Sequence, residues 1–95
     1  MRKSMLDILA CPIDKHYPLE LFELNVLRQN SDKDTVISEG ILFCGKCSRF
    51  FPIMEEIPIM LPDELRERGS EIEFLQKWIK NIPDKVIKHG NPWHL

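Results

Sequence analysis

Three cysteines and one aspartate stand at the spacing of two metal-binding turns. Cys44 and Cys47 are separated by two residues, and Cys11 opens the tetrapeptide Cys-Pro-Ile-Asp, which ends at Asp14. Two thiolates at this spacing can bind one tetrahedral ion, because a tight turn directs both sulfurs inward and its backbone amides stabilise their charge. The sequence therefore predicts a metal site of two half-sites, with a carboxylate where a four-thiolate site has its second cysteine.

The sequence leaves the fourth ligand open. Asp14 keeps the half-site spacing, and a carboxylate oxygen is an established zinc ligand, so we favour it. His16 offers an imidazole five residues after Cys11, and water is the third option. The plain alternative is that no metal binds and the thiols are small buried apolar groups. We expect a structural rather than a catalytic role, because no convincing general base stands beside the cysteines.

Length, charge and cysteine number narrow the class of protein. Ninety-five residues with an apolar fraction of 43% predict one small globular unit, which often needs a metal or a partner to complete its stability. The net charge of −2 gives no reason to expect nucleic acid or an anionic membrane as main partner. Asp7 and Pro12 interrupt the apolar N-terminal stretch, so neither a signal peptide nor a membrane span is expected. Three cysteines without an export signal favour the reducing cytoplasm.

The spacing of apolar residues predicts an α+β fold. Helical spacing over residues 1–10 predicts a short N-terminal helix. Pro58 favours an edge strand or an irregular extended segment, and Glu55-Glu56 before it is a turn without the glycine that hairpins prefer. A turn or bulge is expected at Gly40. The chain is expected to form a small antiparallel sheet of about four strands, at 18–24, 36–43, 49–54 and 57–61.

The composition changes after the last predicted strand. Residues 62–69 are dense in charge and are expected to form a linker or a solvated helical turn. Apolar residues at helical spacing predict a helix over 71–82, with Ser70 as its N-cap. We therefore divide the chain into a zinc-ribbon-like domain over 1–65 and a helical C-terminal extension over 66–95.

Two blocks of sequence resemble a known family. The first is residues 6–15, Leu-Asp-Ile-Leu-Ala-Cys-Pro-Ile-Asp-Lys. The second is residues 40–47, Gly-Ile-Leu-Phe-Cys-Gly-Lys-Cys, which runs into Phe-Phe-Pro-Ile at 50–53 and Ile-Pro-Ile-Met-Leu-Pro at 57–62. Over about residues 3–65 the chain is similar to the small zinc-ribbon-like subunit that activates several methyltransferases of the translation machinery in archaea and eukaryotes, and to its short bacterial relatives.

The resemblance implies a partner subunit without an active site of its own. Family members form heterodimers with class I methyltransferases that use S-adenosylmethionine, stabilise them and support their cofactor binding. The substrates include tRNA, ribosomal RNA and a translation release factor. Carried onto this chain, the resemblance implies structural Zn²⁺ at Cys11, Cys44 and Cys47, with Asp14 at the variant position. It also implies β-strand pairing with the partner through Phe51, Ile53, Met54, Ile57, Pro58, Ile59, Met60 and Leu61.

The apolar run from Phe50 to Leu61 is open to a second interpretation. A chain this small cannot bury all of these side chains, so strand addition to a partner sheet would cover them. Alternatively, they form the domain's own core beneath the helix over 71–82. We expect the inward-pointing subset in the core and the rest at the interface. An uncovered edge also favours self-association when the partner is absent.

The rival function is a stand-alone zinc ribbon that binds nucleic acid. Such a module needs a basic face with stacking aromatic side chains, and Arg49, Phe50 and Phe51 are the only residues that suggest one. The net negative charge weighs against this function, so we expect the chain to contact RNA at most indirectly, through the methyltransferase. A redox or metalloenzyme would need a reactive thiolate or an open metal beside a base. The sequence offers neither, so no catalytic residue is predicted.

Overall fold

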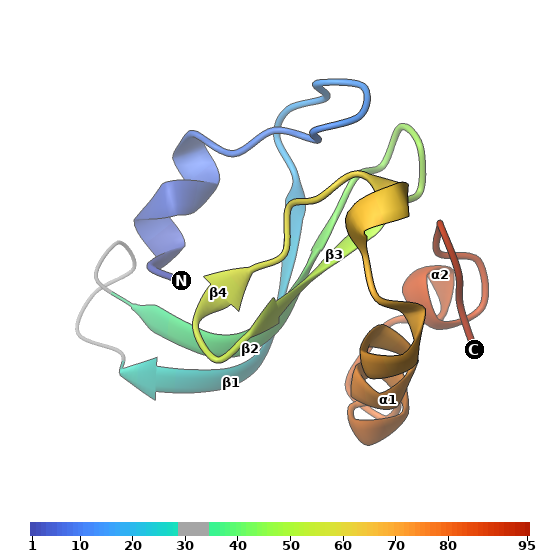
Figure 1. Cartoon of the computed structure of the whole chain (residues 1–95). Coiled ribbons are helices and arrows are strands. Elements are labelled where there is room, and N and C mark those ends of the chain that lie inside the picture. Colours follow the sequence, from blue (N-terminus) through green and yellow to red (C-terminus); the bar gives the residue numbers. More distant parts are fainter. Residues whose placement is uncertain (29–34) are drawn as a thin grey trace.

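The computed structural model describes residues 1–28 and 35–95. A short 3₁₀ helix comes first, followed by a four-stranded antiparallel sheet and three short helical segments (Figure 1). The predicted α+β class is confirmed. The elements are η1 (Lys3–Asp7), β1 (Glu20–Arg28), β2 (Val36–Phe43), β3 (Phe50–Met54), β4 (Ile57–Pro58), η2 (Asp63–Leu65), α1 (Arg68–Lys77) and α2 (Asp84–Ile87).

The strands follow one another across the sheet in the order β1-β2-β3-β4. The central strands β2 and β3 pair without a register shift, and β1 and β4 form the two edges. Pro58 therefore lies on an edge strand, where its missing N–H leaves no ladder hydrogen bond unmade. Glu55 and Glu56 between β3 and β4 both have positive φ, which is the geometry of a type I′ turn that usually takes Asn-Gly.

The strand bounds and the bulge differ from the sequence expectation. β1 continues to Arg28, whereas β4 ends at Pro58. The bulge expected at Gly40 lies on the opposite strand, where the register of β1 with β2 shifts after Glu23. Gly40 itself is required by close packing, because a Cβ there would lie 3.0 Å from the carbonyl oxygen of Phe22. Between the first two expected strands, residues 29–34 lie outside the described residues.

The helices are shorter than the sequence predicts. The N-terminal helix is reduced to η1, and α1 begins early enough that Ser70 lies inside it and Glu67 occupies the N-cap position. The helix cannot continue past Ile79, because the ring of Pro83 would meet the carbonyl group four residues before it. No helix within residues 1–28 and 35–95 is long and apolar enough to cross a membrane.

Apolar side chains cover the sheet on both faces. η1 and the chain before β1 cover one face, and the C-terminal helices cover the other (Figure 1). The division of the chain after residue 65 stays a prediction. The core on the η1 side consists of Met1, Cys11, Leu19, Ile37, Leu42, Cys44, Phe51 and Ile53. The core on the helical side consists of Ile41, Phe43, Phe50, Phe74, Leu75, Ile82, Val86 and Ile87.

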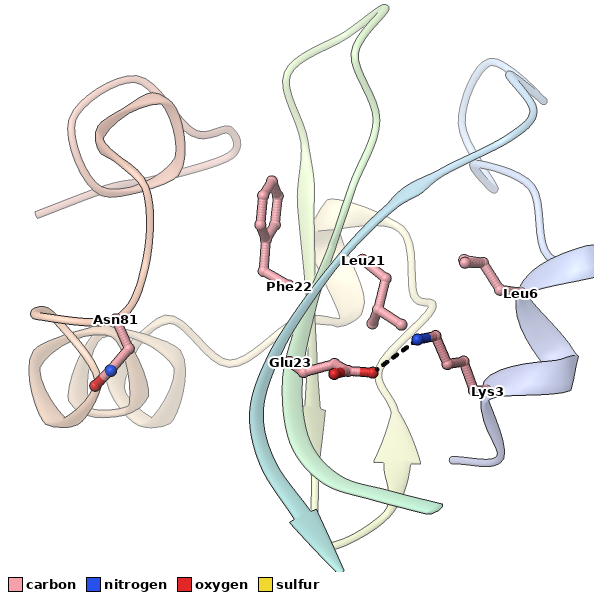
Figure 2. A pocket seen from close by; sticks show the side chains of 6 residues that line it. All are labelled: Lys3, Leu6, Leu21, Phe22, Glu23 and Asn81. Carbon is pink, nitrogen blue, oxygen red and sulfur yellow. Dashed lines mark ion pairs between the residues drawn. The ribbon is translucent and has the colours of Figure 1, made fainter. Parts of the chain in front are cut away.

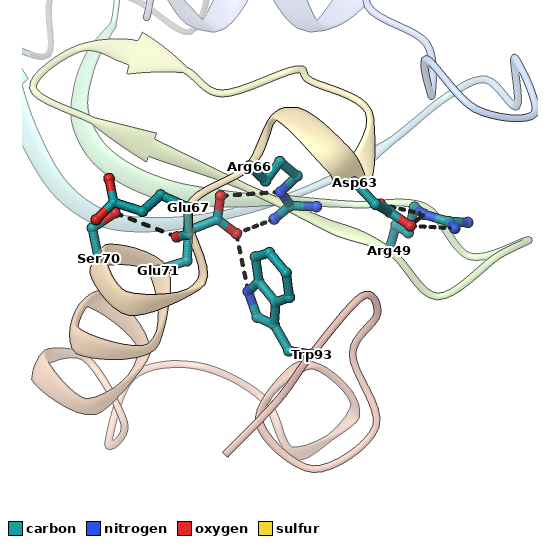
Figure 3. Close-up of polar contacts among 7 residues, drawn as sticks. All are labelled: Arg49, Asp63, Arg66, Glu67, Ser70, Glu71 and Trp93. Carbon is teal, nitrogen blue, oxygen red and sulfur yellow. Dashed lines mark hydrogen bonds and ion pairs between the residues drawn. The ribbon is translucent and has the colours of Figure 1, made fainter.

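A buried ion pair fastens the C-terminal extension to the sheet (Figure 3). Arg66 Nε donates to Glu71 Oε2 at 3.0 Å, and these side chains are 0% and 3% exposed. Trp93 Nε1 donates to Glu71 Oε1 at 3.2 Å. The Arg66 guanidinium also lies over the rings of Phe50 and Phe51, 4.8 and 5.3 Å from their centroids. The pair thus joins α1, the C-terminal tail and β3.

Removing the buried carboxylate should destabilise the fold strongly. We expect Glu71→Ala to lower the free energy of unfolding by about 3–5 kcal/mol, because it leaves the Arg66 charge buried and unpaired. The matched control is Glu20→Ala, which removes a carboxylate paired with Lys85 where both side chains are about half exposed. Its expected effect is about 0–1 kcal/mol. Urea unfolding of both variants measures the difference, and equal losses would contradict the role given to the buried pair.

Candidate functional site

The two metal-binding turns share one backbone geometry. In the first turn the Lys15 N–H donates to the Cys11 carbonyl at 2.8 Å, and in the second the Ser48 N–H donates to the Cys44 carbonyl at 2.9 Å. Lys15 and Ser48 also share a left-handed backbone, with φ of 62° and 61°. Because the turns match, Asp14 occupies the position in the first turn that Cys47 occupies in the second.

The four predicted metal residues form one cluster. One potential ligand atom from each of them lies within 4.8 Å of all the others. Cys11 Sγ lies 3.7 Å from Cys47 Sγ, and Cys44 Sγ lies 3.6 Å from both carboxylate oxygens of Asp14. Around a tetrahedral zinc ion, bonds of about 2.3 Å to sulfur and 2.1 Å to oxygen give separations of about 3.8 Å between two sulfurs and about 3.6 Å between sulfur and oxygen. The cluster is therefore compatible with a zinc site.

His16 contributes to this cluster through its backbone. Its N–H donates to Asp14 Oδ1 at 2.9 Å, whereas the cluster found among the described residues does not include its imidazole. This hydrogen bond is the main reason why the pKa of Asp14 is lowered to about 2, so the carboxylate is charged at neutral pH. The distances thus support Asp14 over His16 as the fourth metal ligand.

The thiols of Cys11 and Cys44 are not set up as nucleophiles. Burial raises the pKa of the Cys11 thiol to about 12 and also raises the pKa of Cys44. A reactive cysteine needs a lowered pKa, because the thiolate is the nucleophile. Zinc binding to such thiols would displace their protons, so the affinity of the site for zinc would increase with pH.

The eight residues predicted to bind a partner divide between core and surface. Phe51 and Ile53 are 0% exposed and belong to the core on the η1 side. Their side chains are therefore the inward-pointing subset, which packs on the η1 side of the sheet. Ile57 and Leu61, in contrast, are 61% and 39% exposed. The remaining four are half-buried: Met54, Pro58, Ile59 and Met60.

Residues 57–60 leave one edge of the sheet open. The Ile59 N–H donates to the Pro52 carbonyl at 2.9 Å, toward β3. Backbone groups of an antiparallel strand alternate between its two sides, so those of Pro58 and Met60 point away from β3. Proline has no N–H, and the open side therefore offers the Pro58 carbonyl and the Met60 amide. A partner strand can add at such an edge.

The opposite edge, β1, is protected by charge (Figure 2). Lys3 on η1 pairs with Glu23 on β1, with Nζ 3.1 Å from Oε1, and Lys85 pairs with Glu20. The first pair crosses a hollow that is lined by Lys3, Leu6, Leu21, Phe22, Glu23 and Asn81. Charged side chains and register irregularities are devices by which edge strands avoid pairing with other chains. The apolar open edge is therefore that of β4.

Sequence reasoning missed an ion pair that joins the second turn to the chain after β4. Arg49 binds Asp63 with two hydrogen bonds, Nε to Oδ1 at 3.0 Å and Nη2 to Oδ2 at 2.7 Å (Figure 3). These bonds lower the pKa of Asp63. No local spacing rule connects two residues so far apart in the chain. The pair also corrects the suggestion of a nucleic-acid surface, because Arg49 is engaged and Phe50 and Phe51 are 0% exposed.

The model of the family described as Trm112p-like protein matches residues 2–56. The chain belongs to the Trm112p-like family. Relatives called UPF0434 protein occur in bacteria. The one from Dechloromonas aromatica (strain RCB) is 37% identical over 71 residues, which cover 75% of this chain and 97% of that protein. The one from Nitrosococcus oceani (strain ATCC 19707) is 30% identical over 74 residues, which cover 78% of this chain and all of that protein. The resemblance seen in the two sequence blocks is thus confirmed.

A solved structure shares the Trm112-like fold. It is the complex between the Haloferax volcanii Trm112 methyltransferase activator and a putative methyltransferase. The match has a TM-score of 0.57 and 36% identity, and it covers 70% of this chain and all of that chain. These three relatives are matched over nearly their whole length, whereas 70–78% of this chain is covered. This chain is therefore longer than these relatives.

Proposed function

We propose that this chain is a non-catalytic subunit that binds, stabilises and activates a class I S-adenosylmethionine-dependent methyltransferase acting on tRNA, ribosomal RNA or a translation release factor. One observation carries the proposal: the Haloferax volcanii Trm112, 36% identical to this chain, was solved in complex with a putative methyltransferase. We place the heterodimer in the cytoplasm. The open β4 edge also favours self-association when no methyltransferase is present.

The proposed interface is the strand edge of residues 57–61. Main-chain hydrogen bonds to the Pro58 carbonyl and the Met60 amide would add a strand of the partner to the sheet. The exposed Ile57 and Leu61 supply apolar contact beside these bonds. Their burial removes apolar surface from water, which favours association.

The proposal assigns the chemistry to the methyltransferase. A general acid or base works best with a pKa near the operating pH. Among the described residues, the thiols of Cys11 and Cys44 have raised pKa values, and the carboxylates of Asp14 and Asp63 have lowered ones. These groups are engaged in the metal cluster or in the ion pair with Arg49, so they hold the fold rather than a substrate.

Capture from cells tests the proposal. Affinity-tagged full-length protein, expressed in its own cells, should bring down a methyltransferase that mass spectrometry identifies and that transfers labelled methyl groups from S-adenosylmethionine. We expect Ile57→Asp to reduce its recovery about tenfold or more, because an unpaired carboxylate buried in an apolar interface costs more than about 1.4 kcal/mol.

The matched control for capture is Leu27→Asp on β1. Leu27 is 62% exposed, against 61% for Ile57, and lies on the opposite edge of the sheet. Recovery should stay at the wild-type level, and urea unfolding confirms that both variants fold. Recovery of nucleic acid without a methyltransferase would contradict the function. Full recovery with Ile57→Asp would contradict the interface.

We also propose that Cys11, Asp14, Cys44 and Cys47 hold one structural zinc ion. Four protein ligands fill a tetrahedral site, which leaves no coordination position for a substrate. Such an ion would join the chain before β1 to the turn between β2 and β3. It would thereby link two segments that are far apart in the sequence.

Metal analysis tests the zinc site. Protein purified without added zinc should contain about one zinc ion per chain. Asp14→Ala should weaken zinc binding in competition with a chelator, and Asp14→Cys should strengthen it, because zinc prefers thiolate ligands. His16→Ala is the control and should keep the ion, since His16 contributes only its N–H. A zinc content near zero with an unchanged fold would contradict the site.

A further inference from the structure

A small pocket lies beside the proposed interface. Ile59, Leu61 and Leu65 line it from the chain after β4, and Arg66 and Ser70 line it from the start of the C-terminal extension. Its volume is about 180 Å³. Sites for small molecules usually measure about 300–1,000 Å³, so this pocket suits a single inserted side chain better than a free ligand.

The pocket is continuous with the strand edge. Ile59 and Leu61 belong to both, and Leu65, which is 65% exposed, lines the pocket beside them. Contiguous exposed apolar side chains on a small protein mark an interaction site. A strand added to β4 would therefore carry neighbouring parts of the same partner over this pocket.

The helical side of the pocket is held in place before any partner arrives. Arg66 and Glu71 both line it, and their buried ion pair is fixed by Trp93 from the C-terminal tail (Figure 3). A preformed wall needs little ordering on binding, which lowers the entropic cost of association. The extension thus does more than cover the sheet, because it also forms a preformed wall beside the β4 edge.

We propose that the C-terminal extension forms a second part of the methyltransferase interface, where the pocket between residues 59–65 and the start of α1 receives one apolar side chain of the methyltransferase. The inference rests on the proposed function and deepens it. The strand edge supplies the contact expected for the family, and the pocket selects a methyltransferase with a protruding apolar residue beside its pairing strand. Glu67 at the exposed pocket rim favours a basic neighbour for that residue.

Photo-crosslinking in the full-length protein, expressed in its own cells, tests this interface. A benzophenone amino acid replaces Ile57, Leu65, Ile79 or Leu27, one at a time. These residues are 61%, 65%, 48% and 62% exposed, so none is required for the core. We expect positions 57 and 65 to crosslink to the same methyltransferase, identified by mass spectrometry. Positions 79 and 27 are the controls and should not crosslink to it.

The outcomes separate the inference from the proposed function. A methyltransferase crosslinked at position 57 but not at 65 overturns the inference and leaves the function standing. Crosslinks from position 65 to a second copy of this chain also overturn it. If position 57 yields no methyltransferase although the tagged chain still captures one, the proposed strand-edge interface fails; if capture also yields none, the proposed function itself fails.

A binding measurement then separates contact from mere proximity. The methyltransferase crosslinked at position 57 is purified and titrated with variants of the full-length chain. Leu65→Asp should weaken its binding about tenfold, since a carboxylate at the pocket mouth opposes insertion of an apolar side chain. Ile79→Asp, elsewhere in the extension, should bind like the wild type. Wild-type affinity of Leu65→Asp would overturn the inference.

Discussion

The pairing of β2 with β3, buried on both faces, is the constraint on which the rest of the structure depends. Phe51 and Ile53 pack beneath η1 and Phe50 packs beneath the C-terminal helices, each with 0% exposure. Since both faces of the central strands are covered, a partner strand has to approach the sheet at an edge. Ion pairs from both flanking layers protect the β1 edge. The short β4 is left as the edge where strand addition meets apolar surface.

The metal cluster is linked to the β4 edge through the turn between β2 and β3. The second metal-binding turn connects β2 to β3, and Arg49 directly after it holds Asp63 in the chain beyond β4. An ion bound to the cluster would therefore stabilise the segment that carries the proposed partner-binding residues without touching the partner. In the proposed arrangement Asp14 contributes to stability, whereas residues 57–61 and the pocket beside them contribute to recognition.

Local sequence patterns predicted the secondary-structure elements better than they predicted what those elements pack against. Alternating apolar residues marked the four strands, and the Cys-x-x-Cys spacing marked the turns whose backbones match. Alternation alone did not reveal that Phe51 and Ile53 lie in the core, because both faces of this sheet are apolar. The contact between Glu71 and Trp93 was beyond prediction, since it joins residues that no local period relates. The steric effect of Pro83 reaches back only to Ile79, so it limits the length of α1 but does not by itself account for its end at Lys77.

Hydrogen–deuterium exchange of the complex captured with its methyltransferase, compared with the free protein, tests the central claim most directly. If a strand of the methyltransferase adds to the β4 edge, the Met60 amide gains a hydrogen-bond acceptor and its exchange slows. We expect this slowing at Met60 and unchanged exchange along β1. Slower exchange along β1 with no change at Met60 would contradict the assignment of the partner to the β4 edge.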